Sequence, residues 1–402
     1  MTHVVVVGAG QAGASLVAKL RNCGFEGDIT LIGAEPCLPY QRPPLSKTYL
    51  LGETARDRLY LRPERFYADN NITLRLGEPV TEVNAGDQTV TVGDETIRYN
   101  ELVFATGSSP RQLPANIGGA LSGVHVVRNL SDIDGMSPSF VKDARVLIIG
   151  GGYIGLEAAA VAASKGLQVT LVEMADRILQ RVAAPETSDY FRALHQRHGV
   201  NILEGVGLDC LLGSDRVTGA RLSDGTKQDF DFVIVGVGIV PSTDLAGMAG
   251  AALENGIKTD VYGATSVPHI WAAGDCASFP YGSGRIRLES VPNAIEQSEI
   301  LAENIMGGHK EYRAKPWFWS DQYDVKLQIA GLNTGYNGVI SRAADGGATS
   351  HWYYLADRLL AVDAMNAPRD FMIAKRLIEA GKSPAPETIG NPKTDLKSLL
   401  KA

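Results

Sequence analysis

Cysteine is scarce in this chain, whose 402 residues include only Cys23, Cys37, Cys210 and Cys276. No two of them have the spacing of a redox dithiol or of a metal-ligand pair. An enzyme that passes electrons to a disulfide needs two neighbouring thiols, so we expect no disulfide reduction here. We also expect no bound metal, and we interpret each cysteine as a small buried hydrophobic residue.

Positive charge is also in short supply, because 38 lysines and arginines face 45 acidic residues and the formal net charge is -7. This balance argues against binding to nucleic acid or to acidic membranes. No apolar run is long enough for membrane insertion. The first 18 residues lack a charged side chain, but a glycine motif interrupts them and no basic segment precedes them, so we expect no signal peptide. We therefore expect a cytoplasmic protein.

Glycine, by contrast, is abundant, and the pattern GxGxxG occurs at residues 8–13 and again at residues 150–155. In this fingerprint the first glycine permits a tight turn and the second lets the backbone approach a pyrophosphate. The third lets the helix pack closely against the strand. A single copy is weak evidence, but two distant copies indicate two bound dinucleotides.

The flanks of the first copy complete a strand–helix–strand unit. A β-branched run at residues 4–7 predicts a buried strand, residues 14–21 have helical spacing, and residues 29–32 predict a second strand. Glu35 follows that strand and is expected to accept hydrogen bonds from a ribose.

The second copy repeats this order, with strands at 145–149 and 168–172 and an alanine-rich helix at 156–165. The second strand ends in Glu173. A carboxylate at this point pairs with a 2′-hydroxyl and repels a 2′-phosphate, so we expect NADH rather than NADPH. Arg177 is the nearest cation and is the one feature that favours NADPH.

Several further segments make a family resemblance specific. They are residues 39–47 (PYQRPPLSK), 102–107 (LVFATG), 236–241 (GVGIVP), 265–275 (TSVPHIWAAGD), 289–294 (ESVPNA) and 316–322 (PWFWSDQ). In this order, and over almost the whole chain, they closely resemble the FAD-dependent ferredoxin reductases of bacterial oxygenase and cytochrome P450 systems.

The resemblance implies an α/β architecture of the glutathione-reductase type, with two Rossmann-like dinucleotide-binding domains and a C-terminal α+β domain. The FAD domain is expected at 1–110 and 242–318, the NADH domain at 111–241, and the C-terminal interface domain at 319–402. In the C-terminal domain we predict strands at 325–330, 339–341, 351–355 and 359–363, and a helix from Arg369 to Glu379.

The resemblance also implies site residues. Lys47 is expected near flavin N5, paired with Glu157, and these two are the candidate catalytic residues. The implied FAD site comprises Gly8, Gly10, Ala12, Gly13, Glu35, Arg42, Lys47, Val80, Thr106, Gly107, Arg128, Gly274, Asp275, Val291 and Trp319. Members of the family often carry the acidic residue that faces the ribose at the position of Ala34, so Ala34 is the alternative to Glu35 there. The implied NADH site comprises Gly150, Gly152, Tyr153, Ile154, Gly155, Glu173 and Gly238.

The implied activity is hydride transfer from NADH to one tightly bound FAD per chain. Two single-electron transfers then pass to a separate [2Fe–2S] ferredoxin, which supplies a P450 or another oxygenase. Six basic and three acidic residues follow Phe371, so the end of the chain carries a small net positive charge. Docking of an acidic ferredoxin requires a surface of this sign.

The sequence is also compatible with three alternative functions. An NADH oxidase or peroxidase would use Cys37 as its redox-active thiol. A monodehydroascorbate-type reductase would share both nucleotide sites. A signalling flavoprotein like apoptosis-inducing factor would hold a long-lived complex of reduced flavin and NAD.

Overall fold

The computed structural model describes residues 2–343 and 347–401, which divide into two compact units. Unit 1 comprises Met1–Gln41, Ala55–Ser109 and Ile239–Pro316, and unit 2 comprises Arg42–Thr54, Pro110–Gly238 and Trp317–Ala402. The C-terminal segment therefore belongs to the same compact unit as the second fingerprint. The domain boundaries expected from the sequence stay predictions.

Unit 1 is built around a five-stranded parallel sheet. Its strand order is β19 (Ile270–Ala272), β7 (Glu101–Phe104), β1 (His3–Val7), β2 (Asp28–Gly33) and β3 (Ile72–Leu76). Val4 to Val7 of β1 are all buried, as the run of β-branched residues predicts.

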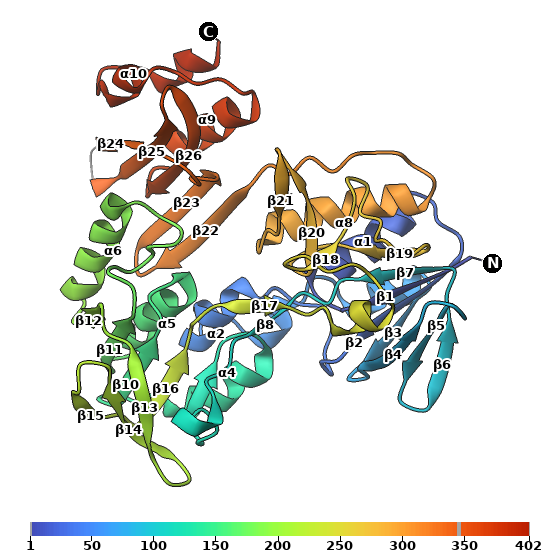
Figure 1. Ribbon diagram of the computed structural model, residues 1–402, viewed down its shortest axis with the longest axis horizontal. Helices are drawn as coiled ribbons and strands as arrows, with labels where there is room; N and C mark the ends of the chain where they lie inside the picture. The colour runs from blue at the N-terminus through green and yellow to red at the C-terminus, as the bar shows by residue number, and fades with distance from the viewer. Residues whose placement is uncertain (1, 344–346, 402) are drawn as a thin grey trace. The chain divides into compact units, whose positions relative to one another are not determined.

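The two faces of this sheet have different covers (Figure 1). One face packs against helices α1 (Gln11–Asn22) and α8 (Val291–Ile305). The other packs against the antiparallel strands β4 (Val80–Asn84), β5 (Thr89–Val92) and β6 (Glu95–Arg98). Unit 1 also contains α3 (Glu64–Asp69), β17 (Ile239–Pro241), α7 (Asp244–Met248), β18 (Ile257–Lys258), β20 (Ala277–Tyr281) and β21 (Gly284–Ile286).

Unit 2 repeats the parallel architecture. Its first sheet has the order β12 (Asn201–Glu204), β11 (Gln168–Glu173), β10 (Arg145–Ile149), β16 (Phe232–Val235) and β9 (Val124–Val126). Its helices before the C-terminal part are α2 (Thr48–Leu51), α4 (Leu130–Met136), α5 (Tyr153–Ser164) and α6 (Pro185–Arg197). An antiparallel sheet is formed by β13 (Leu208–Gly213), β14 (Val217–Leu222) and β15 (Lys227–Asp229). Strand β8 (Ser108–Pro110) ends at the first residue of the segment Pro110–Gly238 of unit 2.

The C-terminal part of unit 2 is a five-stranded antiparallel sheet with the order β22 (Trp317–Gln322), β23 (Val325–Gly331), β26 (Arg358–Met365), β25 (Thr349–Leu355) and β24 (Gly338–Ala343). Helix α9 (Pro368–Glu379) packs its apolar face on Trp352 and Val362, and α10 (Pro386–Gly390) follows it. The four predicted strands and the predicted helix are confirmed. Strand β22 was not predicted, because its residues were treated only as a family motif.

Candidate functional site

The first fingerprint forms a tight turn at the carboxyl end of β1. Gly8 has φ +119°, and a Cβ there would overlap the carbonyl oxygen of Ala105. A Cβ on Gly13 would overlap the carbonyl oxygen of Gly8. At Gly10, which precedes the first residue of α1, a Cβ would meet no described atom within 4 Å. The outer glycines are thus required by packing, whereas Gly10 leaves room where a pyrophosphate would approach.

The second fingerprint has the same geometry. Gly150 has φ +106°, and a Cβ there would overlap the carbonyl oxygen of Gly236. A Cβ on Gly155 would overlap the carbonyl oxygen of Gly150. A Cβ on Gly152, which precedes α5, would again meet no described atom within 4 Å. Both turns therefore fit a dinucleotide phosphate at the start of a helix.

The acidic residues of the two copies are not equivalent. Val7 pairs with Ile32 and Ile149 pairs with Val172, so Glu173 corresponds in register to Gly33 rather than to Glu35. A Cβ on Gly33 would lie 2.6 Å from the Cβ of Ala9, so this position has no room for an acidic side chain.

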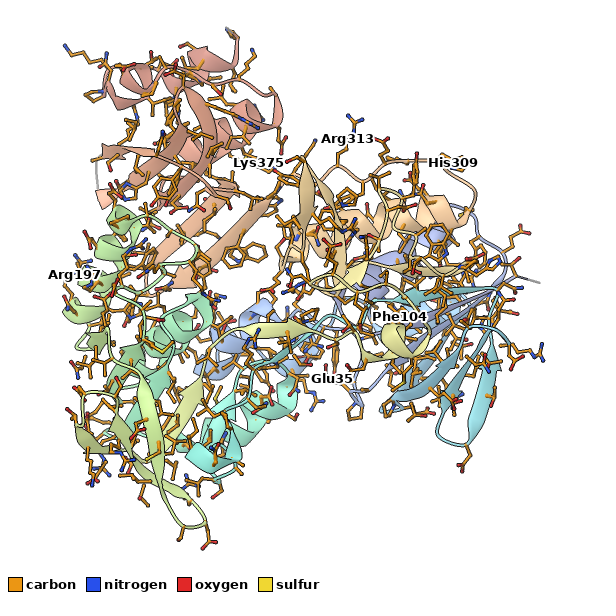
Figure 2. All side chains as sticks on the ribbon, in the orientation of Figure 1. Glu35, Phe104, Arg197, His309, Arg313 and Lys375 are labelled. Carbon is orange, nitrogen blue, oxygen red and sulfur yellow. The ribbon has the colours of Figure 1, made fainter. Side chains whose placement is uncertain are left out.

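Glu35 lies two residues further along the chain (labelled in Figure 2). Its Oε2 accepts a hydrogen bond of 2.6 Å from the hydroxyl of Tyr40, and Ala34 is exposed. Which of the two faces a ribose stays a prediction.

Glu173 lies directly beside the second fingerprint. Its Oε2 accepts from the backbone N–H of Gly151 at 2.7 Å, and its Oε1 accepts from that of Ala175 at 2.8 Å. Two bonds from the main chain hold the carboxylate at the edge of the phosphate turn, where an adenine ribose would lie.

Arg177 does not point toward Glu173. Its guanidinium donates to Ser188 Oγ at 2.5 Å and to the carbonyl oxygen of Ala183 at 2.8 Å. These bonds join the loop after β11 to the beginning of α6. The cation that favoured NADPH in the sequence is therefore held in a structural role.

Lys47 and Glu157 form an ion pair within unit 2. Lys47 Nζ lies 2.7 Å from Glu157 Oε2, and the Glu157 side chain is only 2% exposed. Two serines that sequence reasoning missed complete the cluster. Ser46 Oγ donates to Glu157 Oε2 at 2.6 Å, and Ser320 Oγ donates to Oε1 at 2.7 Å. The family motifs contained both serines, but nothing in their spacing linked them to Glu157.

The other expected FAD residues of unit 1 gather near the carboxyl ends of β7 and β19. Thr106 Oγ1 donates to the carbonyl oxygen of Ser242 at 2.6 Å, and Gly107 has φ +68°. A Cβ on Gly274 would lie 3.0 Å from the Cβ of Ala12. The next residue, Asp275, accepts from Ser108 Oγ at 3.1 Å.

Val80 and Val291 also lie in unit 1, the first buried on β4 and the second at the start of α8.

The remaining expected residues lie in unit 2. Arg42 Nη1 donates to the carbonyl oxygen of Arg128 at 2.9 Å, and the Trp319 ring lies 5.6 Å from that of Trp317. In the expected NADH site, Tyr153 is half-buried, Ile154 is 43% exposed and Gly238 has φ +97°.

Three classes of feature are absent from the described residues. No group of three or more His, Cys, Asp or Glu could hold a metal ion. None of the described helices has the length and apolarity that a membrane span requires. None of the four cysteines forms a disulfide, and only Cys276 is buried, which raises the pKa of its thiol. Cys23 is exposed and Cys37 and Cys210 are half-buried, so the expectation of a buried cysteine is wrong at these three positions.

In the C-terminal part of unit 2, several basic side chains have partners. Lys375 of α9 (Figure 2) contacts Glu379 at 2.5 Å, and Lys382 donates to the carbonyl oxygen of Leu400 at 3.1 Å. The expected docking role of this region stays a prediction.

Comparison with known proteins agrees with this geometry. Residues 2–298 match the pyridine nucleotide-disulphide oxidoreductase family, and residues 317–400 match the reductase C-terminal family. The chain is 41% identical to rhodocoxin reductase of Rhodococcus erythropolis over 99% of its length and 94% of that protein. It is 39% identical to putidaredoxin reductase of Pseudomonas putida, over 100% and 97%.

Among solved structures, the covalent complex of putidaredoxin reductase with putidaredoxin superposes with a TM-score of 0.96. The identity is 39%, and the match covers 100% of this chain and 98% of that chain. The expected fold class is therefore confirmed, and the chain belongs to the pyridine nucleotide-disulphide oxidoreductase family.

Proposed function

We propose that this protein is an FAD- and NADH-dependent ferredoxin reductase, which passes electrons from NADH to a [2Fe–2S] ferredoxin that supplies a cytochrome P450 or another oxygenase. The observation that carries the proposal is the pair of fingerprint turns, each with an unobstructed middle glycine, in a chain that matches relatives named as ferredoxin reductases over 99% of its length. When bound, FAD accepts an electron pair from NADH and releases electrons singly.

The chain's own residues supply binding and placement. The N–H groups at the starts of α1 and α5 would hold the two pyrophosphates, at Gly10 for FAD and at Gly152 for NADH. Glu173 would accept a hydrogen bond from the adenosine 2′-hydroxyl of NADH and repel a 2′-phosphate, which favours NADH.

We assign the charged pair to the flavin. Lys47, held by Glu157, would place a cation beside the isoalloxazine ring, where it stabilises negative charge. Asp275 would bind the ribityl chain. The domains proposed are an FAD domain at 1–110 and 242–318, an NADH domain at 111–241 and an interface domain at 319–402. A cytoplasmic location is proposed too, since four cysteines without a disulfide among them suit a reducing compartment.

The purified protein tests this proposal directly. It should be yellow, with one FAD per chain, and its visible absorbance should bleach when NADH is added without oxygen. NADPH should bleach it more slowly at equal concentration. A colourless protein, or a flavin that NADH does not reduce, would rule the proposal out.

A further inference from the structure

The polar side chains of β22 have no role in the function proposed above. Ser320 and Gln322 belong to the family motif at 316–322, and both are completely buried. A buried polar side chain is costly unless it is hydrogen-bonded, and a hydrophobic residue would fill the same space without that cost. Their hydrogen bonds therefore need an explanation.

Both carboxylate oxygens of Glu157 are bonded. Oε2 accepts from Lys47 Nζ at 2.7 Å and from Ser46 Oγ at 2.6 Å, whereas Oε1 accepts from Ser320 Oγ at 2.7 Å. Ser46 precedes Lys47 in the chain, but Ser320 reaches Glu157 from the C-terminal sheet. Ser320 is the partner that fixes the second oxygen, and hence the rotation of the carboxylate that anchors Lys47.

The bonds beyond Ser320 have only one consistent direction. A carboxylate can only accept, so the Ser320 hydroxyl must donate to Glu157 and is then free to accept. It accepts from Gln322 Nε2 at 3.2 Å, which leaves Gln322 Oε1 as the acceptor for His195 Nε2 at 2.8 Å. The proton of the His195 ring is thereby placed on Nε2.

The end of this hydrogen-bond series that lies farthest from Glu157 is formed by α6 and by the turn between β22 and β23. His195 is fully buried, and desolvation lowers its pKa to about 4, so the ring is neutral near pH 7. Its Nδ1 accepts from the hydroxyl of Tyr323 at 3.3 Å. Tyr323 has φ +56°, a backbone conformation that costs energy in a bulky residue. Its ring stacks on His198 at 3.7 Å.

Every donor in this series thus points toward Glu157: Tyr323 to His195, His195 to Gln322, Gln322 to Ser320, and Ser320 to the carboxylate. Hydrogen bonds arranged in one direction polarise and strengthen one another. A series that ends on the partner of an ammonium group is suited to holding that group in one place.

We infer that Ser320 is a positioning residue for the Lys47–Glu157 pair and that Gln322 and His195 hold Ser320 in its donating orientation. The inference rests on the proposed function, which places Lys47 beside the flavin. It gives the polar residues of the C-terminal sheet a part in setting how readily NADH reduces the flavin.

The test is the two-electron midpoint potential of the flavin in the purified holoenzyme, measured anaerobically against a reference dye. Ser320→Ala removes the donor to Oε1 and lets Glu157 and Lys47 move, so the reduced flavin loses stabilisation and its potential becomes more negative. We expect the equilibrium constant for reduction to fall by about threefold to tenfold, and tenfold corresponds to about 30 mV for a two-electron couple. Gln322→Leu should act in the same direction with a smaller effect. The Kd for NAD⁺ should stay unchanged in both variants.

Ser350 offers a matched control. It is also completely buried in the C-terminal sheet, donates to Asp370 Oδ2 at 2.7 Å and accepts from Trp352 Nε1 at 2.9 Å. Ser350→Ala removes a hydroxyl from the same kind of environment, with no bond to Glu157, and should keep the wild-type potential.

The outcomes separate the two proposals. A colourless wild-type protein, or one that NADH cannot reduce, contradicts the proposed function and this inference with it. With a reducible wild type, the inference alone is overturned if Ser320→Ala keeps the wild-type potential or if Ser350→Ala shifts it equally. An unchanged potential in Gln322→Leu would remove Gln322 and His195 from the assigned role.

Discussion

At the scale of the residue, the glycines of one motif have two different physical reasons to be glycine. Gly8 has a positive φ and no room for a Cβ, so it is required by the fold itself. Gly10 has neither constraint in the protein alone. Its lack of a side chain matters only when a phosphate group approaches the backbone. A substitution at Gly10 should therefore affect cofactor binding without affecting folding.

Gly10→Ala should therefore leave the stability of the apoprotein within about 0.5 kcal/mol of wild type and weaken FAD binding at least tenfold. Gly8→Ala should destabilise the apoprotein by about 2 kcal/mol or more, because it combines a strained φ with a backbone overlap. Urea unfolding of the apoproteins and FAD titration followed by flavin fluorescence measure the two effects. Equal loss of stability in both variants would contradict this division of roles.

At the scale of the element, a buried polar cluster joins α6 to the C-terminal sheet. The hydroxyl of Thr187, in the first turn of α6, donates to Asp363 Oδ2 at 2.7 Å, and that of Tyr353 donates to the same oxygen. Tyr353 also accepts from the backbone N–H of Ala184 at 3.0 Å. Burial raises the pKa of the Asp363 carboxyl to about 6, although both hydrogen bonds oppose the shift.

The raised pKa predicts a pH-dependent contribution to stability. An unfolded Asp titrates near about 3.9, so between about pH 4 and pH 6 the folded protein binds more protons than the unfolded chain. The stabilising contribution of Asp363 is thus present below pH 4 and lost as the pH rises through 6. As the pH rises from 4 to 7, the free energy of unfolding of Asp363→Asn should increase relative to that of wild type by about 2 to 3 kcal/mol.

Urea unfolding across this pH range tests the prediction, with the exposed Asp357 on the turn between β25 and β26 as the control. Asp357→Asn should follow wild type at every pH. A constant difference between Asp363→Asn and wild type would show that the carboxyl does not change its proton affinity on folding.

At the scale of the whole molecule, the repeated strand–glycine–helix order made the two parallel sheets predictable. Local patterns also located the C-terminal strands and α9. Glu35 lies two residues beyond the position that corresponds to Glu173, and this difference was not predictable. It depends on the pairing register of the strands and on Ala9, which occupies the space beside Gly33. Nor could sequence spacing reveal that Ser46 and Ser320 meet at Glu157, since residues far apart in the chain are brought together only by the fold.

In the proposed function, electrons arrive from NADH in a pair and leave one at a time. This electron transfer can be followed by anaerobic stopped-flow mixing of the NADH-reduced holoenzyme with an excess of an oxidised [2Fe–2S] ferredoxin. We predict re-oxidation of the flavin together with reduction of two ferredoxins for each NADH consumed. If NADH reduces the flavin but the flavin stays reduced in the presence of ferredoxin, the protein is not a ferredoxin reductase.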